Sequence, residues 1–77
     1  MYYGKRRWYR MAQYKISMAA ARVNANLTQE DVAKAMKLNK STIISWERGR
    51  ITPKPAQFRM YCEIVGAPED IIILPKK

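Results

Sequence analysis

The chain of 77 residues is long enough for one small domain with a modest core, and it leaves little room for a catalytic cleft. Fifteen lysines and arginines against six aspartates and glutamates give a formal net charge of +9, which favours a polyanionic partner, nucleic acid before an anionic membrane surface. With no histidine and one cysteine, the sequence excludes an intramolecular disulfide, a zinc site built from protein ligands alone, and Ser-His or Cys-His catalysis. We therefore expect neither an enzyme nor a metal or cofactor site.

Residues 1–15 form a basic and aromatic N-terminal extension that contains no acidic residue. Three interpretations are open: an arm that contacts phosphates or a minor groove, a solvated tail with one or two rings on the core, or a segment before an alternative start at Met11. The extension lacks the apolar stretch of a secretory signal, and no run in the chain is apolar enough to span a membrane, so we expect a cytoplasmic protein. The cations that would serve an arm are Lys5, Arg6, Arg7 and Arg10.

The folded domain is predicted over residues 16–77, beginning with a helix over residues 16–26. Ser17 can cap the start of this helix, and Asn26 suits a left-handed position at its end. The apolar stripe of the helix is predicted to consist of Met18, Ala21 or Ala20, and Val23.

Residues 28–49 predict two short helices joined by a tight turn. Thr28 can cap the first helix, and acidic residues in its opening turn suit the positive end of the helix dipole. Residues 37–39 would form the turn, from which Leu38 can enter the core. The inner face of this first helix is predicted to consist of Val32, Ala33 and Met36.

The second helix of the pair is predicted over residues 40–48. Asn39 or Ser41 can cap its start, and Gly49 can close it in a left-handed conformation. Its inner face is predicted to consist of Ile43, Trp46 and Glu47.

A basic loop over residues 48–54 separates this pair from a further helix predicted over residues 57–65. Cys62 lies on the apolar face of that helix, so we interpret it as a small core residue rather than a nucleophile. Pro68 would open a last short helix that continues through residues 71–74, a run more apolar than a closing helix needs. The apolar face of the 57–65 helix is formed by Phe58, Tyr61, Cys62 and Val65.

The pattern T-Q-x-x-V-A-x-x-M-x-L-x-x-S-T-I-x-x-W-E-x-G over residues 28–49 resembles the motif of the Cro/lambda-repressor-like helix-turn-helix family, also called the XRE family. The resemblance extends over about residues 16–74 and implies an all-α, compact five-helix bundle that binds DNA. Lys37 departs from the family pattern, which usually has glycine at that position. The resemblance also implies an ion pair between Arg22 and Glu47, and a glutamate on an apolar face does need a partner.

In this family the second helix of the motif enters the major groove, and the residue types of helix 40–48 suit base edges. Lysine can donate to guanine, serine can bond to several bases, and isoleucine can touch a thymine methyl group. Because no arginine or glutamine lies in the middle of the helix, much of the affinity is expected to come from phosphates and to fall with salt. The predicted base contacts are Lys40, Ser41, Ile44 and Ser45. The predicted backbone contacts are Gln29, Asn39, Thr42, Arg48, Arg50, Thr52 and Lys54.

We therefore predict a sequence-specific regulator of transcription that binds double-stranded DNA, a repressor of the small bacterial or phage type, with no small-molecule ligand. It would act as a homodimer, and the apolar run from Ile71 to Leu74 is the candidate interface. Two alternatives are an antitoxin-like or adaptor module whose DNA binding is secondary, and an RNA-binding or nucleoid-like basic protein.

Overall fold

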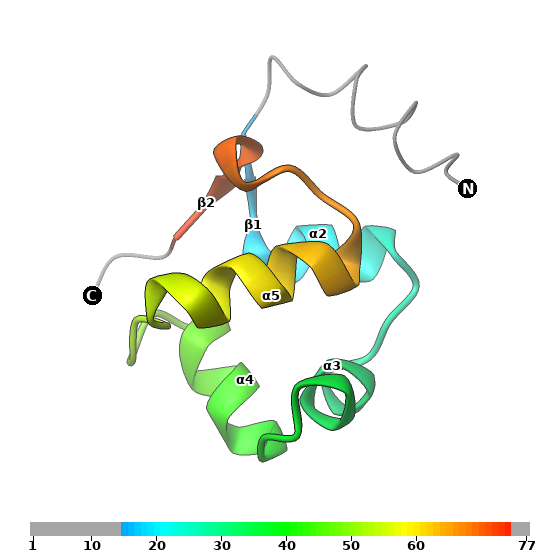
Figure 1. Ribbon diagram of the computed structural model, residues 1–77, viewed down its shortest axis with the longest axis vertical. Coiled ribbons are helices and arrows are strands. Elements are labelled where there is room, and N and C mark those ends of the chain that lie inside the picture. Colours follow the sequence, from blue (N-terminus) through cyan, green and yellow to red (C-terminus); the bar gives the residue numbers. More distant parts are fainter. Residues whose placement is uncertain (1–14, 75–77) are drawn as a thin grey trace.

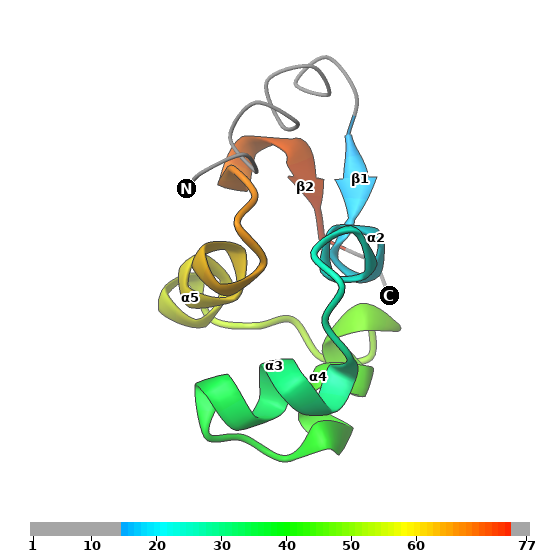
Figure 2. The same cartoon turned by 90° about the vertical axis from the view of Figure 1, so that its right-hand side faces the viewer.

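A computed structural model describes residues 15–74, and within them it contains four α-helices, one 3-10 turn and a pair of short strands. The helices are α2 (Met18–Asn24), α3 (Gln29–Met36), α4 (Lys40–Glu47) and α5 (Pro55–Val65). The strands are β1 (Ile16–Ser17) and β2 (Ile72–Ile73), and η1 (Glu69–Ile71) is the 3-10 turn before β2. Figures 1 and 2 show α3 and α4 at one end of the molecule, the strands at the other, and α2 and α5 between them.

Three helices begin beside a residue whose chemistry favours a helix start, although α5 begins two residues earlier than predicted. Ser17 Oγ accepts a hydrogen bond from the Ala20 N–H at 3.0 Å and caps α2. Thr28 and Asp31 form a reciprocal capping box at the start of α3, with bonds of 3.0 and 2.9 Å. Pro55 occupies the first turn of α5, where a missing N–H costs nothing.

The core is formed by one buried cluster to which every helix contributes. Trp46 and Tyr61 are its largest members, and their rings meet edge to face with centroids 6.5 Å apart. The predicted inner faces of α3 and α4 are confirmed, and Cys62 is buried in α5 as predicted. The fully or nearly buried apolar residues are Met18, Ala21, Val32, Ala33, Met36, Ile43, Trp46, Tyr61, Cys62, Val65, Ala67, Ile71 and Ile72.

The predicted stripe of the first helix is wrong at Val23, which is 60% exposed. Met18, Ala21 and Arg22 follow the spacing of one helical face and point inward. Val23 lies five residues after Met18, which turns it about 140° away from that face.

The prediction of five helices is wrong at the two ends of the domain. Residues 16–17 are extended and pair in parallel with β2, with Ile16 opposite Ile72 and Ser17 opposite Ile73. The predicted fifth helix is a single 3-10 turn followed by that strand. A run of three isoleucines favours extended backbone, because β-branched side chains fit a strand better than a helix.

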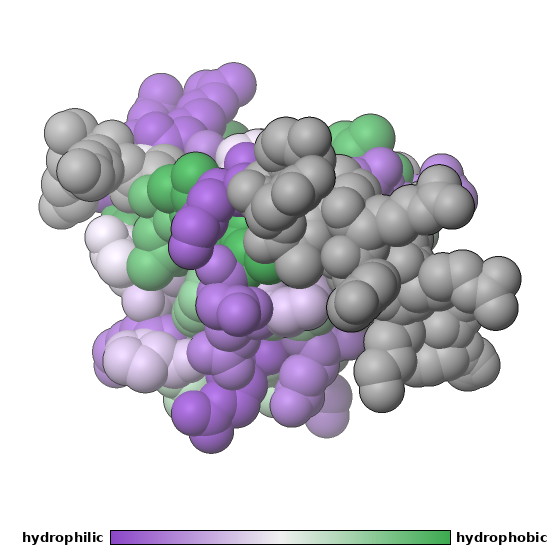
Figure 3. All heavy atoms as spheres, turned by 90° about the horizontal axis from the view of Figure 1, so that it is seen from above, coloured by the Kyte–Doolittle hydropathy of each residue, from purple (hydrophilic) through white to green (hydrophobic). Residues whose placement is uncertain are grey.

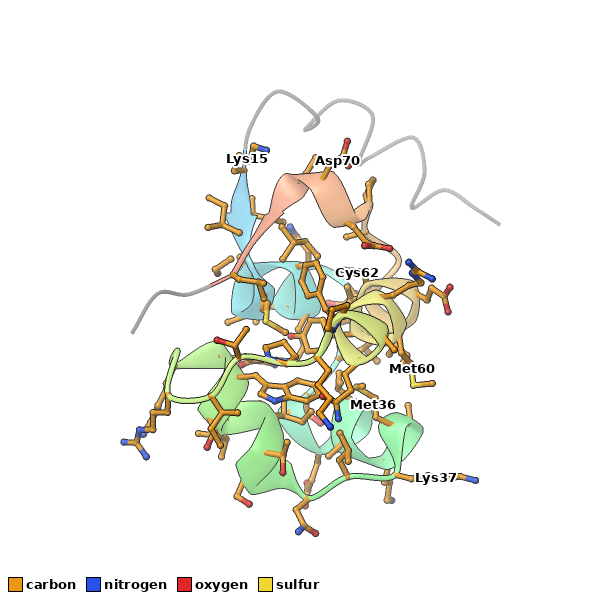
Figure 4. The ribbon with its side chains drawn as sticks, turned by 60° about the vertical axis from the view of Figure 1, so that its left-hand side comes forward. Lys15, Met36, Lys37, Met60, Cys62 and Asp70 are labelled. Atoms are coloured by element: carbon orange, nitrogen blue, oxygen red, sulfur yellow. The ribbon has the colours of Figure 1, made fainter. Side chains whose placement is uncertain are left out.

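Lys15 joins the same two segments, because its ammonium group donates to the main-chain oxygen of Asp70 at 2.9 Å. Figure 4 shows both residues at the strand end of the molecule. Both segments are therefore anchored far from α4 (Figures 1 and 2). No helix within residues 15–74 has the length and apolar character needed to cross a membrane.

Candidate nucleic-acid interface

The position of α4 is fixed by Glu47, whose carboxylate is buried with only 4% of the side chain exposed. Arg22 in α2 approaches it side-on, with Nε 2.8 Å from Oε2 and Nη2 3.2 Å from Oε1. Gln29 in α3 donates from Nε2 to Oε1 at 3.1 Å, and the Tyr61 hydroxyl in α5 lies 2.7 Å from Oε2. One carboxylate therefore connects all four helices of the described chain.

Arg22 also donates from Nη1 to the main-chain oxygen of Leu27 at 2.8 Å. This bond ties the segment between α2 and α3 to the same network. In the described chain no buried side-chain nitrogen or oxygen lacks a hydrogen-bond partner, so the desolvation of the pair is compensated by bonds.

The protonation states follow from this geometry. Burial raises the pKa of Glu47, but the hydrogen bonds from Arg22, Tyr61 and Gln29 outweigh it, and the pKa lies below its ordinary value. The bond to Glu47 raises the pKa of Arg22. Burial, followed by the bond to Glu47, raises the pKa of Tyr61 far above its ordinary value. The network is therefore an ionised pair with a neutral tyrosine.

Tyr61 was predicted only as a member of an apolar face, and its bond to Glu47 was missed. Its single hydroxyl proton lies between two acceptors, Glu47 Oε2 at 2.7 Å and the Met18 main-chain oxygen at 2.9 Å. The shorter, charge-assisted bond favours Glu47. The signal was available in the sequence, because a tyrosine on a buried face needs a partner for its hydroxyl group.

The turn between α3 and α4 is closed by Lys37, which has φ 58 and ψ 43 in the left-handed region. The Leu38 N–H donates to the Ala33 oxygen at 2.8 Å, and the Leu38 side chain packs against the core as predicted. A lysine in this conformation carries a strain of about 1–2 kcal/mol that glycine would avoid. Lys37 therefore takes a conformation that favours glycine over other residues.

With α3 and α4 oriented in this way, the predicted base-contact residues lie along one helix. Lys40 and Ser41 are exposed in the first turn of α4, and Ile44 and Ser45 are partly exposed one turn later. The buried residues of α4 are Ile43 and Trp46, and Glu47, its one acidic residue, is committed to the network. The free side of α4 therefore carries no negative charge.

The predicted backbone-contact residues lie at both ends of α4. Arg48, Arg50, Thr52 and Lys54 are exposed in the chain that follows it, where Gly49 has φ 77 as predicted. The Arg50 N–H donates to the Ser45 oxygen at 2.9 Å, which holds the loop against the end of the helix. Lys54 donates its main-chain N–H to Gln57 Oε1 at 3.0 Å, so its side chain remains available.

Gln29, Asn39 and Thr42 complete the predicted set. Asn39 is the N-cap residue of α4, yet its side chain makes no capping bond. Thr42 is half-buried within the first turn of α4. Gln29 is half-buried, and one of its amide N–H groups is engaged by Glu47, which leaves fewer donors for a phosphate than the sequence suggested.

Some of the predicted residues lie outside the residues that the structure describes. They are the four cations of the N-terminal extension, Lys5, Arg6, Arg7 and Arg10, together with the alternative start at Met11.

Two short helices, α3 and α4, joined by a tight turn and with one side of α4 free, define a helix-turn-helix protein. The chain belongs to the helix-turn-helix domain family, XRE-like, whose family model matches residues 18–74. Searches of curated proteins and of solved structures gave no match. Membership of this family indicates a DNA-binding regulator.

Proposed function

We propose that the protein is a sequence-specific regulator of transcription that inserts α4 into the major groove of double-stranded DNA. The observation that carries this proposal is the division of α4 into two sides. Ile43, Trp46 and Glu47 hold one side in the core, while the other side offers lysine, serine and isoleucine with no acidic residue. A helix fixed in this way presents the same atoms to every duplex it meets, which direct readout requires.

Each exposed residue type has a matching group on a base edge. Lys40 would donate to guanine N7 and O6, and the hydroxyl groups of Ser41 and Ser45 would bond to more than one base. Ile44 would touch a thymine methyl group, and its partial exposure on this side of α4 supports that role. Gln29, Asn39, Thr42, Arg48, Arg50, Thr52 and Lys54 would contact the sugar-phosphate backbone.

We further propose that the protein represses transcription as a homodimer bound to a two-fold site. Occupation of a promoter needs no additional contact, which favours repression over activation. Ile71 and Ile72 are buried in the core and cannot contact a second subunit. The candidate interface therefore consists of Ile73, which is 49% exposed, and the half-buried Leu74. Figure 3 looks onto the strand end of the molecule and shows apolar surface beside hydrophilic side chains there.

The DNA proposal is tested by selecting bound sites from a pool of random duplexes with the full chain. We expect one enriched two-fold motif, and we expect Lys40→Glu and Ile44→Glu to abolish the enrichment because they add negative charge to the groove side of α4. Val23→Glu is the matched control, since Val23 is 60% exposed on α2, outside the proposed interface. Absence of any motif with the parent chain would refute sequence-specific binding.

The dimer proposal is tested by sedimentation equilibrium of the parent and of Ile73→Glu. A dimer that becomes a monomer on this change supports the interface. A parent that remains a monomer both free and on its selected DNA contradicts it.

A further inference from the structure

Lys37 is the exception among the left-handed residues of the described chain. Positive φ angles occur there at Asn26, Lys37, Gly49 and Gly66, with values of 61, 58, 77 and 72. Glycine adopts this conformation without strain, and asparagine is the side chain that tolerates it best. Lysine has neither advantage, so the backbone conformation does not explain why a lysine occupies position 37.

The turn leaves no alternative conformation for residue 37. Its N–H donates to the main-chain oxygens of Ala33 and Lys34, and the Leu38 N–H also donates to the main-chain oxygen of Ala33. This closure places the Leu38 side chain against the core while reversing the chain into α4. Any residue at this position must be left-handed, so lysine keeps the strain for as long as the motif is folded.

The side chain of Lys37 is free to act on a partner. It is exposed, and Figure 4 shows it extending from the turn away from the body of the molecule. Lys34, three residues before it, is also exposed. We call Lys34 and Lys37 the turn cluster.

We propose that Lys37 is a DNA phosphate contact, and that the turn cluster holds the backbone at one end of α4 while Arg48, Arg50 and Lys54 hold it at the other. We call the latter three the loop cluster. An α-helix of eight residues is about 12 Å long, close to the width of about 12 Å of the major groove. Cations at the two ends of α4 can therefore reach the two phosphate backbones that border the groove. This inference rests on the proposed function and adds a contact that the family motif, with glycine at this position, does not provide.

The test measures affinity for a labelled duplex of random sequence over a range of salt concentrations, together with the melting temperature of the free chain. The variants Lys37→Gly and Lys37→Asn remove the charge and suit the left-handed backbone, and Lys37→Arg keeps the charge. Arg59→Gln is the control for loss of one charge elsewhere, since the Arg59 side chain is 69% exposed on α5.

We expect Lys37→Gly and Lys37→Asn to weaken binding about fivefold near 0.15 M salt and to reduce the slope of log K against log salt by about 0.9. Lys37→Gly should at the same time melt about 2–5 °C higher than the parent, because the relief of strain exceeds the extra chain entropy that glycine loses on folding. Lys37→Arg and Arg59→Gln should bind as the parent does. Stability and affinity would then move in opposite directions at one residue.

Two failures are distinguishable. If the parent binds duplex with a steep salt dependence and the two neutral variants bind equally well, Lys37 is not a contact and this inference is wrong. If the parent shows no salt-dependent binding to duplex at all, the proposed function itself is wrong.

Discussion

Glu47 aligns the helices because its buried carboxylate needs hydrogen-bond donors, and the other three helices supply them. Its carboxylate is reached by Arg22, Gln29 and Tyr61, each from a different helix, at distances between 2.7 and 3.2 Å. Those lengths are within the range of well-formed hydrogen bonds. A shift of α4 would lengthen several of them together, so the network fixes the helix that carries the proposed base contacts.

Glu47→Gln should lower the free energy of unfolding by about 3–5 kcal/mol, because it leaves the guanidinium of Arg22 buried without its counter-charge. Denaturant unfolding followed by circular dichroism measures the change. Glu63→Gln is the matched control on the exposed side of α5, and it should stay within about 0.5 kcal/mol of the parent. An equal effect of the two substitutions would contradict the role of the network.

The same carboxylate predicts a pH dependence. Since the pKa of folded Glu47 lies below its ordinary value of 4.5, its stabilisation is complete above that value and is lost as the pH falls through the folded pKa. The difference in unfolding free energy between the parent and Glu47→Gln should be constant from about pH 7 to about pH 5 and shrink below that. A difference that stays constant down to about pH 3 would contradict the lowered pKa.

At the scale of residues, the sequence predicted several helix ends because caps are local, but α2 begins at Met18 and α5 at Pro55, each two residues from its predicted start. Ser17, Thr28 and Gly49 occupy the positions that their chemistry favours. The bonds of Gln29 and Tyr61 to Glu47 were not predicted, because they join residues 18 and 14 positions apart through the tertiary fold.

At the scale of elements, the paired strands bring the two ends of the domain together. Ile72 is 6% exposed and Ile73 is 49% exposed, which is the alternation of a strand. The spacing of apolar residues could not identify this strand, because four consecutive apolar residues from Ile71 to Leu74 fit either a helix or a strand. Their pairing with Ile16 and Ser17 depends on a contact across almost the whole domain.

The pair Ile72→Thr and Ile73→Thr tests the strand assignment. Both substitutions keep a β-branched side chain, so they differ mainly in burial. Ile72→Thr should lower the free energy of unfolding by about 1–3 kcal/mol, because it places a hydroxyl group in the core. Ile73→Thr should change it by less than about 0.5 kcal/mol. Equal losses in denaturant unfolding would mean that the two side chains are equally buried.

At the scale of the whole molecule, many charged side chains of residues 15–74 are divided between its two ends. The turn cluster and the loop cluster lie at the end that carries α3 and α4, while Glu69 and Asp70 lie in η1 at the strand end (Figures 1 and 2). These cations favour the approach of a polyanion to the end that presents α4.

The most direct test of the account is the ratio of affinities for a selected site and for a scrambled duplex at physiological salt. The parent should prefer its site by a factor on the order of 1,000 or more. Ile44→Ala should reduce that ratio about tenfold by removing a thymine contact, while Ile51→Ala, an exposed isoleucine of the loop, should leave it unchanged. A parent ratio near one, or equal effects of the two substitutions, would contradict base readout by α4.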